Sequence, residues 1–149
     1  MERRPHLPGL LALSLLALPL LAAMNQDPAG HDADETPLML QMQVLKSGMK
    51  GLRRSLRDPQ QNDASLEVVL EMQAASQLAK VEPPQMAAQV PEAERPAFVA
   101  AYRMEMVETQ KVLLDLELAL LASDSENAQA IYQRLKALEE EGHEHFTVE

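Results

Sequence analysis

The sequence predicts an all-α protein that folds as an antiparallel up-down-up-down four-helix bundle. Leu, Ala, Met, Glu and Gln dominate the composition, whereas aromatic residues make up only 3% of the chain. This is a helix-forming composition, poor in the residues that strands favour. Four segments also repeat apolar residues at intervals of three and four, as amphipathic helices do. Two short connections and one long middle connection between them suit the up-down-up-down order.

The first helix is expected over residues 37–56, PLMLQMQVLKSGMKGLRRSL. Thr36 is placed to cap it through its hydroxyl, and Pro37 fits the first helical position, where no amide donor is needed. Asp58 and Pro59 end it, because proline disfavours a helical conformation in the residue before it. The large apolar residues form one heptad stripe: Leu38, Met42, Leu45, Met49, Leu52 and Leu56.

A second helix is expected from Ala64 to about Val81, capped by Asn62 or Asp63. Two consecutive prolines at 83–84 end it, and a long proline-rich connection follows as far as residue 95. The apolar positions read as a stripe that faces the core: Leu66, Val69, Leu70, Ala74, Leu78 and Val81.

The third helix is expected to begin at Pro96 and to run to about Ala122. Ser123 and Glu126 then have the S-x-x-E form of a capping box, which predicts that the fourth helix starts almost without a loop. The third stripe consists of Phe98, Tyr102, Met106, Thr109, Leu113, Leu116 and Leu120, and the fourth of Ala128, Ile131, Leu135, Leu138 and Phe146.

The first 35 residues differ in composition from the rest. Residues 1–23 combine a basic start, a fifteen-residue apolar run and a small-residue cleavage site, which predicts a secretory signal peptide. The run is short of the ~20 residues that span a bilayer, so we expect cleavage and no stable membrane anchor. Residues 24–35 read as a flexible leader, and residues 36–149 as the bundle. Since the chain has no cysteine, a lipoprotein anchor, disulfides and thioether-linked haem are excluded. A bacterial periplasm is the expected destination.

The charge balance limits the classes of partner. Without residues 1–23 the chain has 11 basic and 22 acidic residues, a net charge of −11. This argues against nucleic acid, whose phosphates would be repelled, and favours a partner protein with a basic docking face. No nucleophile–base pair, glycine-rich phosphate loop or HExxH pattern is present, so hydrolytic and phosphoryl-transfer chemistry have no support.

The predicted topology brings candidate ligands to one end of the bundle. Met42 lies early in the first helix and His143 near the end of the last, so the two come to a comparable depth from the same end. Phe98 and Tyr102, which open the third helix, are expected at this end, with Leu78 and Val81 in the lining. Met/His ligation is one way to hold haem iron at a raised potential. The periodicity of the fourth helix does not separate His143 from His145, which lie at similar angles on either side of the stripe.

A resemblance adds to this pattern. The shared features are an early Met in QMQVLKSGMK, a Pro-Pro after the second helix, an F-x-x-x-Y pair opening the third, and the ending KALEEEGHEHF. In these features the chain resembles the soluble periplasmic cytochrome b562 family. The resemblance implies an electron-transfer protein, not an enzyme, with one non-covalent b-type haem. It implies Met42 and His143 as axial ligands, and Phe98 and Tyr102 as aromatics packed on the porphyrin.

Two other classes stay open. The first is a copper-binding protein, because Met39, Met42 and Met49 offer soft thioether donors, and His143 and His145 offer imidazoles. The second is a cofactor-free helical bundle that serves as a chaperone or adaptor of the cell envelope.

Overall fold

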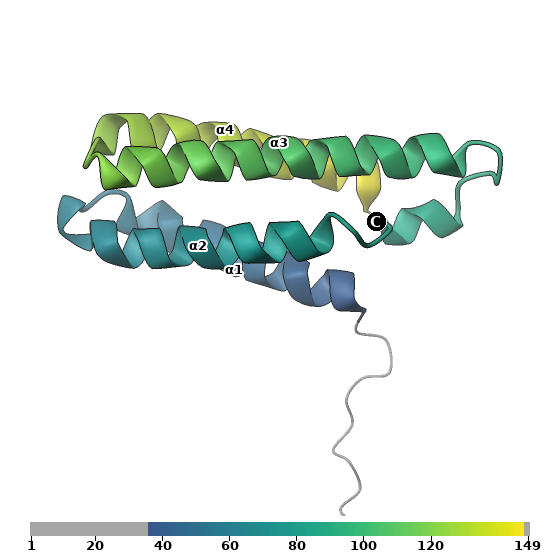
Figure 1. The fold of residues 1–149 in the computed structure, drawn as a ribbon, viewed down its shortest axis with the longest axis horizontal. Helices are drawn as coiled ribbons and strands as arrows, with labels where there is room; N and C mark the ends of the chain where they lie inside the picture. The colour runs from purple at the N-terminus through teal and green to yellow at the C-terminus, as the bar shows by residue number, and fades with distance from the viewer. Residues whose placement is uncertain (1–35, 148–149) are drawn as a thin grey trace, which may run out of the picture. The chain divides into compact units, whose positions relative to one another are not determined.

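The computed structural model describes residues 36–147, which are helical and contain no strand. The four α-helices are joined by short 3₁₀ segments and turns (Figure 1). In chain order the elements are α1 (Pro37–Ser55), η1 (Pro59–Gln61), α2 (Asn62–Ala79), η2 (Gln85–Ala88), α3 (Arg95–Leu121) and α4 (Ser125–Phe146). The expectation of an all-α protein with four helices is confirmed.

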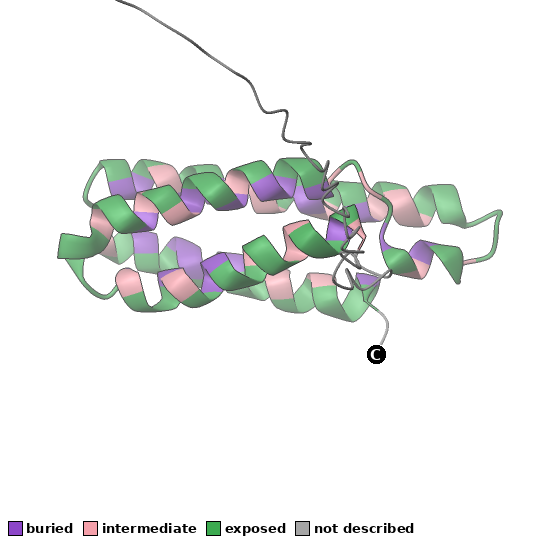
Figure 2. Ribbon diagram, turned by 90° about the horizontal axis from the view of Figure 1, so that it is seen from below, coloured by how far each residue is buried: buried purple, intermediate pink, exposed green. Residues whose placement is uncertain are grey.

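Consecutive helices pack against each other, and α4 also contacts α1. Buried residues recur along every α-helix (Figure 2), and the apolar ones form two clusters. The main cluster consists of Met49, Leu52, Leu56, Val69, Met72, Val112, Leu113, Leu116, Ala119, Leu120, Ala128, Ile131, Tyr132 and Leu135. The cavity cluster consists of Leu38, Ala79, Tyr102, Met106 and Phe146.

Two buried tyrosines connect helices that are distant in sequence. The hydroxyl of Tyr132 on α4 donates a hydrogen bond to the carbonyl oxygen of Met49 on α1, over 3.2 Å. The hydroxyl of Tyr102 on α3 donates to the carbonyl oxygen of Ala79 on α2, over 3.0 Å. Each phenol is thereby satisfied inside an apolar core, where an unpaired hydroxyl would be costly. The tyrosines therefore fix α4 on α1 and α3 on α2.

The predicted stripes of α1, α3 and α4 are confirmed, since their residues are all buried or half-buried. The start of α1 is also as expected. Pro37 occupies its first turn, and the Thr36 hydroxyl accepts a hydrogen bond from the Met39 amide over 3.3 Å. The heptad stripe therefore identifies the buried face of each of these helices, although α3 also carries large apolar residues outside its stripe that stay exposed.

The prediction for α2 is wrong in part. Leu70, Ala74, Leu78 and Val81 are exposed, and only Val69 and the half-buried Leu66 of the predicted stripe face the core. The buried face instead carries Ser65, Val69, Met72, Ala75, Ser76 and Ala79. Small Ser and Ala side chains let the neighbouring helices approach closely, and Met72 fills the space beside Gly48 on α1. The second helix has apolar residues on two faces, so the largest ones did not identify the inward face.

Two predicted caps are also wrong. Asn62 lies within α2, and Asp58 instead accepts a hydrogen bond from the Gln60 amide over 3.0 Å and so caps η1. Ser123 has a positive φ of 55° and is outside α4. Asp124 caps α4, because its carboxylate accepts from the Asn127 amide over 3.1 Å. The tight reversal after α3 uses a left-handed residue, which moves the cap one position along the chain.

The predicted signal peptide (residues 1–23) and leader (residues 24–35) lie outside the described residues. Within the described helices, none is long and apolar enough to cross a membrane.

Candidate functional site

An apolar cavity of about 380 Å³ lies beside the cavity cluster and is lined by residues from the start of α1, the end of α4 and η2. All four α-helices contribute to its wall. Its volume falls in the range of small-molecule and cofactor sites, ≈ 300–1,000 Å³. Thioethers are its most frequent functional group, contributed by Met39, Met42, Met49, Met72 and Met106.

His143 is the one histidine in the wall of this cavity. Its Nδ1 lies 2.7 Å from the carbonyl oxygen of Glu139, one turn earlier on α4. A carbonyl oxygen only accepts, so Nδ1 carries the hydrogen and the neutral ring keeps its lone pair on Nε2. Histidines that bind a metal through one ring nitrogen commonly donate the other N–H in this way. The ring is therefore held in the tautomer that suits coordination through Nε2.

Helix α4 ends just beyond this histidine, and Thr147 caps its last turn. The Thr147 hydroxyl donates a hydrogen bond to the His143 carbonyl over 2.7 Å, which satisfies one of the carbonyls left unpaired at a helix C-terminus. His145 does not line the cavity; its ring makes an edge contact with Phe146 at a centroid distance of 5.9 Å. The structure therefore separates the two histidines that periodicity left equivalent.

Met42 lines the cavity from α1, and it is half-buried. Leu38, Met39, Gln43 and Leu45 of the same helix also line the cavity. Met42 and His143 thus approach one space from the first and the last helix, as the sequence predicted. Their donor atoms, one thioether sulfur and one imidazole nitrogen, form a soft and borderline pair that suits iron or copper.

Of the two aromatic residues predicted for the site, only one lines the cavity. Tyr102 lines the cavity, whereas Phe98 is not among the lining residues. Phe146 lies between them, at ring-centroid distances of 5.2 Å from Phe98 and 5.4 Å from Tyr102. Tilted and edge-to-face contacts at these distances stabilise aromatic clusters. Phe98 therefore supports the wall from behind. Leu78 and Val81, expected in the lining, are exposed instead.

Glu105 is a cavity-lining residue that the sequence analysis did not single out. It lines the cavity from α3, and its Oε1 lies 2.7 Å from the point where a Cβ on Gly142 would be. Burial raises the pKa of the Glu105 carboxyl above its ordinary value, Glu141 raises it further, and His145 opposes the rise. The signal in the sequence was weak, because Glu105 stands beside the stripe and Gly142 is 37 residues away.

Among residues 36–147 there is no group of three or more His, Asp or Glu side chains that could hold a metal. The wall of the cavity offers thioethers and one imidazole as soft and borderline donors, beside the carboxylates of Glu105 and Glu139. No family model matches the chain, and neither a curated protein nor a solved structure matches it.

Proposed function

We propose that the protein is a periplasmic b-type cytochrome, in which an antiparallel up-down-up-down four-helix bundle holds one haem b non-covalently. Met42 and His143 would hold the haem iron. The protein would transfer single electrons and would not be an enzyme. Its redox partner would dock through a basic face, because the chain is acidic, with 23 acidic against 13 basic residues.

Cross-helix contacts support the antiparallel order. Gln73 on α2 bonds to Glu117 on α3 over 2.7 Å, and Lys80, the residue that follows the end of α2, bonds to Gln110 on α3 over 3.0 Å. Residue numbers therefore rise along α2 as they fall along α3. On α1 and α4, Gln129 donates to the Leu56 carbonyl over 3.3 Å, and the later Tyr132 donates to the earlier Met49. The same inverse order holds for this pair.

The observation that carries the haem proposal is the hydrogen bond from His143 Nδ1 to the Glu139 carbonyl, in the wall that also holds Met42. It fixes the tautomer that an axial histidine needs. The residues present fit the group, since a thioether, an oriented imidazole and an apolar wall are the requirements of a Met/His-ligated haem. When bound, the haem iron supplies one-electron redox chemistry. Met42 and His143 would set its ligation, and the surrounding apolar side chains would exclude water.

Absorption spectra of single variants test the assignment. With one haem bound, Met42→Ala and His143→Ala should each lose the six-coordinate spectrum of the reduced protein, because each removes one axial donor. Met39→Ala and His145→Ala are the matched controls, since each removes the same chemical group from a nearby position. Retention of the six-coordinate spectrum by Met42→Ala or His143→Ala would contradict the ligand assignment.

Copper(I) is the second candidate for this cavity. Met39, Met42, Met49 and His143 all line it, and thioethers with an imidazole are the donors that Cu(I) prefers. A competition titration with a Cu(I) chelator distinguishes the candidates. Saturable binding of one Cu(I), lost in both Met42→Ala and Met49→Ala, together with no binding of hemin, would favour copper over haem.

A further inference from the structure

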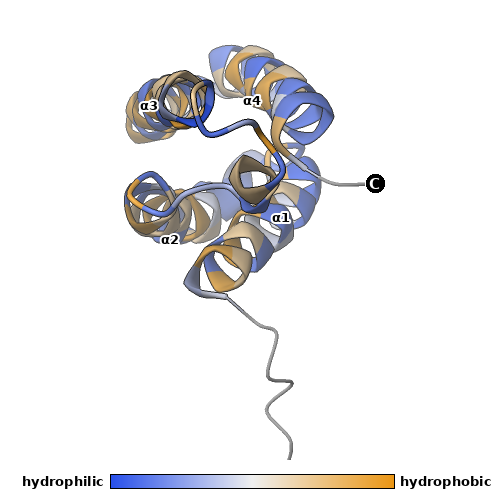
Figure 3. Ribbon diagram, turned by 90° about the vertical axis from the view of Figure 1, so that its right-hand side faces the viewer, coloured by the Kyte–Doolittle hydropathy of each residue, from blue (hydrophilic) through white to orange (hydrophobic). Residues whose placement is uncertain are grey.

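The apolar cavity has few charged residues in its wall. Among the described residues that line it, Lys46 on α1 is the one lysine or arginine, and Glu105 on α3 and Glu139 on α4 are the acidic residues. Hydrophilic residues lie beside hydrophobic ones on each of these three helices (Figure 3). The few polar groups of an apolar pocket commonly fix the orientation of its ligand. The places of the cation and of the two carboxyl groups therefore limit how a charged ligand can lie in the cavity.

Lys46 lies at the mouth of the cavity. It is exposed to solvent although it lines the cavity, whereas Glu105 and Glu139 are half-buried. Met42, the proposed iron ligand, is four residues earlier on α1, so the two side chains are neighbours on one face of the helix. A lysine can lay its apolar stem along such a wall and keep its ammonium group in water. The ammonium group of Lys46 is thus placed to meet a charged group at the mouth.

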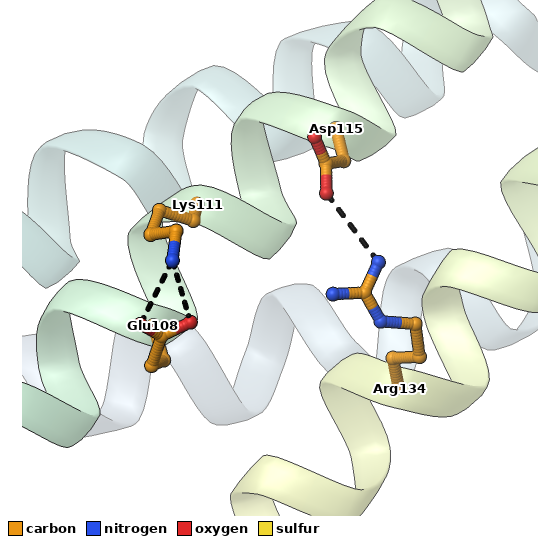
Figure 4. A network of polar contacts seen from close by, with 4 residues as sticks. All are labelled: Glu108, Lys111, Asp115 and Arg134. Atoms are coloured by element: carbon orange, nitrogen blue, oxygen red, sulfur yellow. Dashed lines mark hydrogen bonds and ion pairs between the residues drawn. The ribbon is translucent and has the colours of Figure 1, made fainter.

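Lys46 makes no ion pair with any residue of the described chain. Cations elsewhere on the bundle do have such partners. Lys111 pairs with Glu108 over 2.9 Å, and Arg134 pairs with Asp115 over 3.4 Å (Figure 4). An unpaired lysine at the mouth of an apolar cavity can bind an anionic group of a ligand without first breaking an ion pair.

Haem b has this combination of properties, because it is an apolar macrocycle with two propionate carboxylates at one edge. A carboxylate that is buried without a partner is costly, so this edge must lie near water or a cation. Glu105 and Glu139 supply no positive charge. We propose, given the haem function proposed for the cavity, that Lys46 binds a propionate carboxylate and thereby sets the orientation of the haem. Lys46 is then a specificity-determining residue, which favours a carboxylate-bearing macrocycle over an uncharged one.

Lys50 provides a matched control for Lys46. It lies one turn further along α1, it is likewise exposed, and it makes no ion pair with a described residue. It does not line the cavity. Replacing either lysine removes the same charge from the same helix, so an effect of net charge on the binding of an anionic ligand would appear in both variants.

Titrations with hemin and with hemin dimethyl ester, followed in the Soret band, test the proposal, because the ester lacks the propionate charges. Lys46→Ala should weaken hemin binding about tenfold, since the bound macrocycle shields the pair of charges from water on one side. It should change the dissociation constant of the ester by less than about twofold. Lys50→Ala should change neither constant by more than about twofold. Lys46→Arg should bind hemin like the native chain, because it keeps the cation.

Several results would overturn the assignment of Lys46 alone. Lys46→Ala could bind hemin as tightly as the native chain does, or could lose affinity for hemin and for the ester equally, as a side chain that only packs on the macrocycle would. Equal weakening by Lys46→Ala and Lys50→Ala would show a general effect of charge. In each of these cases the native chain still binds hemin, so the haem function stands. A native chain that binds no hemin would overturn the haem function and this inference together.

Discussion

The main cluster and the cavity cluster bury their side chains in different ways. Leu52, Val69, Leu113 and Leu116 of the main cluster are fully buried, and they come from three helices that fill the space between them. In the cavity cluster, Tyr102, Met106 and Phe146 surround a space of about 380 Å³. Close packing makes a region rigid and sensitive to volume. The difference indicates that the main cluster holds the fold together, whereas the cavity cluster, with Met49, Met72 and Leu135 from the edge of the main cluster, surrounds a space that a ligand could enter.

The largest difference between the two regions is expected from truncating a leucine in each. Leu113→Ala should lower the free energy of unfolding by about 4–5 kcal/mol, because a fully buried side chain leaves a cavity that its neighbours cannot fill. Leu38→Ala should cost only about 2–3 kcal/mol, since Leu38 borders space that is already present. Urea denaturation of both variants measures this. Equal losses would mean that the two clusters are packed equally tightly.

Two glycines, Gly48 beside the main cluster and Gly142 beside the cavity cluster, test the same difference in packing. A Cβ on Gly48 would overlap Cγ and Sδ of Met72, in the main cluster. Gly48→Ala should therefore destabilise the protein by about 1–3 kcal/mol. A Cβ on Gly142 meets only the end of the Glu105 side chain, which has room to move. Gly142→Ala should be near neutral, because alanine gains up to about 1 kcal/mol of helix propensity. Thermal unfolding separates the two results, and a larger loss for Gly142→Ala would contradict the account.

Each cluster contains one buried tyrosine, and removing its hydroxyl should change the free energy of unfolding by a smaller amount. Tyr102→Phe and Tyr132→Phe should each cost about 0.5–1.5 kcal/mol at neutral pH, the net value of one hydrogen bond. We expect similar losses, because both hydroxyls donate to a helix carbonyl. Urea denaturation at pH 7 measures both. A cost well above this range for Tyr102→Phe alone would mean that the hydrogen bond also holds the Tyr102 ring in its packed position.

The same tyrosine predicts a pH dependence. Burial, with a further contribution from the charge of Glu82, raises the pKa of Tyr102 from 10 to about 12. The folded state therefore holds this proton more tightly than the unfolded state does. The resulting stabilisation is complete below pH 10 and is lost as the pH rises from 10 to about 12. The native protein should melt above Tyr102→Phe at neutral pH and should lose this advantage as the pH rises toward 12, where its melting temperature should equal that of the variant or fall below it. A constant gap between the two would contradict the raised pKa.

The sequence was informative where a heptad stripe of large apolar residues runs along the buried face of a helix. The stripes of α1, α3 and α4 predicted which residues are buried, and the topology predicted that Met42, Tyr102 and His143 reach the same cavity. The sequence-based prediction failed for α2, because its large apolar residues lie on two faces. Leu70 and Leu78 are on the exposed face, and Met72 is on the buried face. The cap of α4 also escaped prediction, since it depends on the left-handed conformation of Ser123. Contacts such as the one between Glu105 and Gly142 depend on the distance between helices. The periodicity of the sequence does not give that distance.

The choice between His143 and His145 shows the same limit of prediction from the heptad pattern, here at a proposed ligand. Both histidines are near the end of α4, and their angles about the helix axis are similar. The packing of Phe146 against Phe98 and Tyr102 fixes how this end of the helix sits on α3. Only with that orientation does His143 lie in the cavity wall and His145 outside it. A side-chain contact between two helices therefore decides what the heptad pattern left open.

The most direct test of the cavity as a haem site is a titration of the purified native protein with hemin, followed in the Soret band. The account predicts a saturable change at one hemin per chain and reducible visible bands. It also predicts a higher melting temperature, because a ligand that binds only the folded state adds about 2.7 kcal/mol of stability at a hundredfold excess over Kd. A Soret change that never saturates, with an unchanged melting temperature, would contradict it.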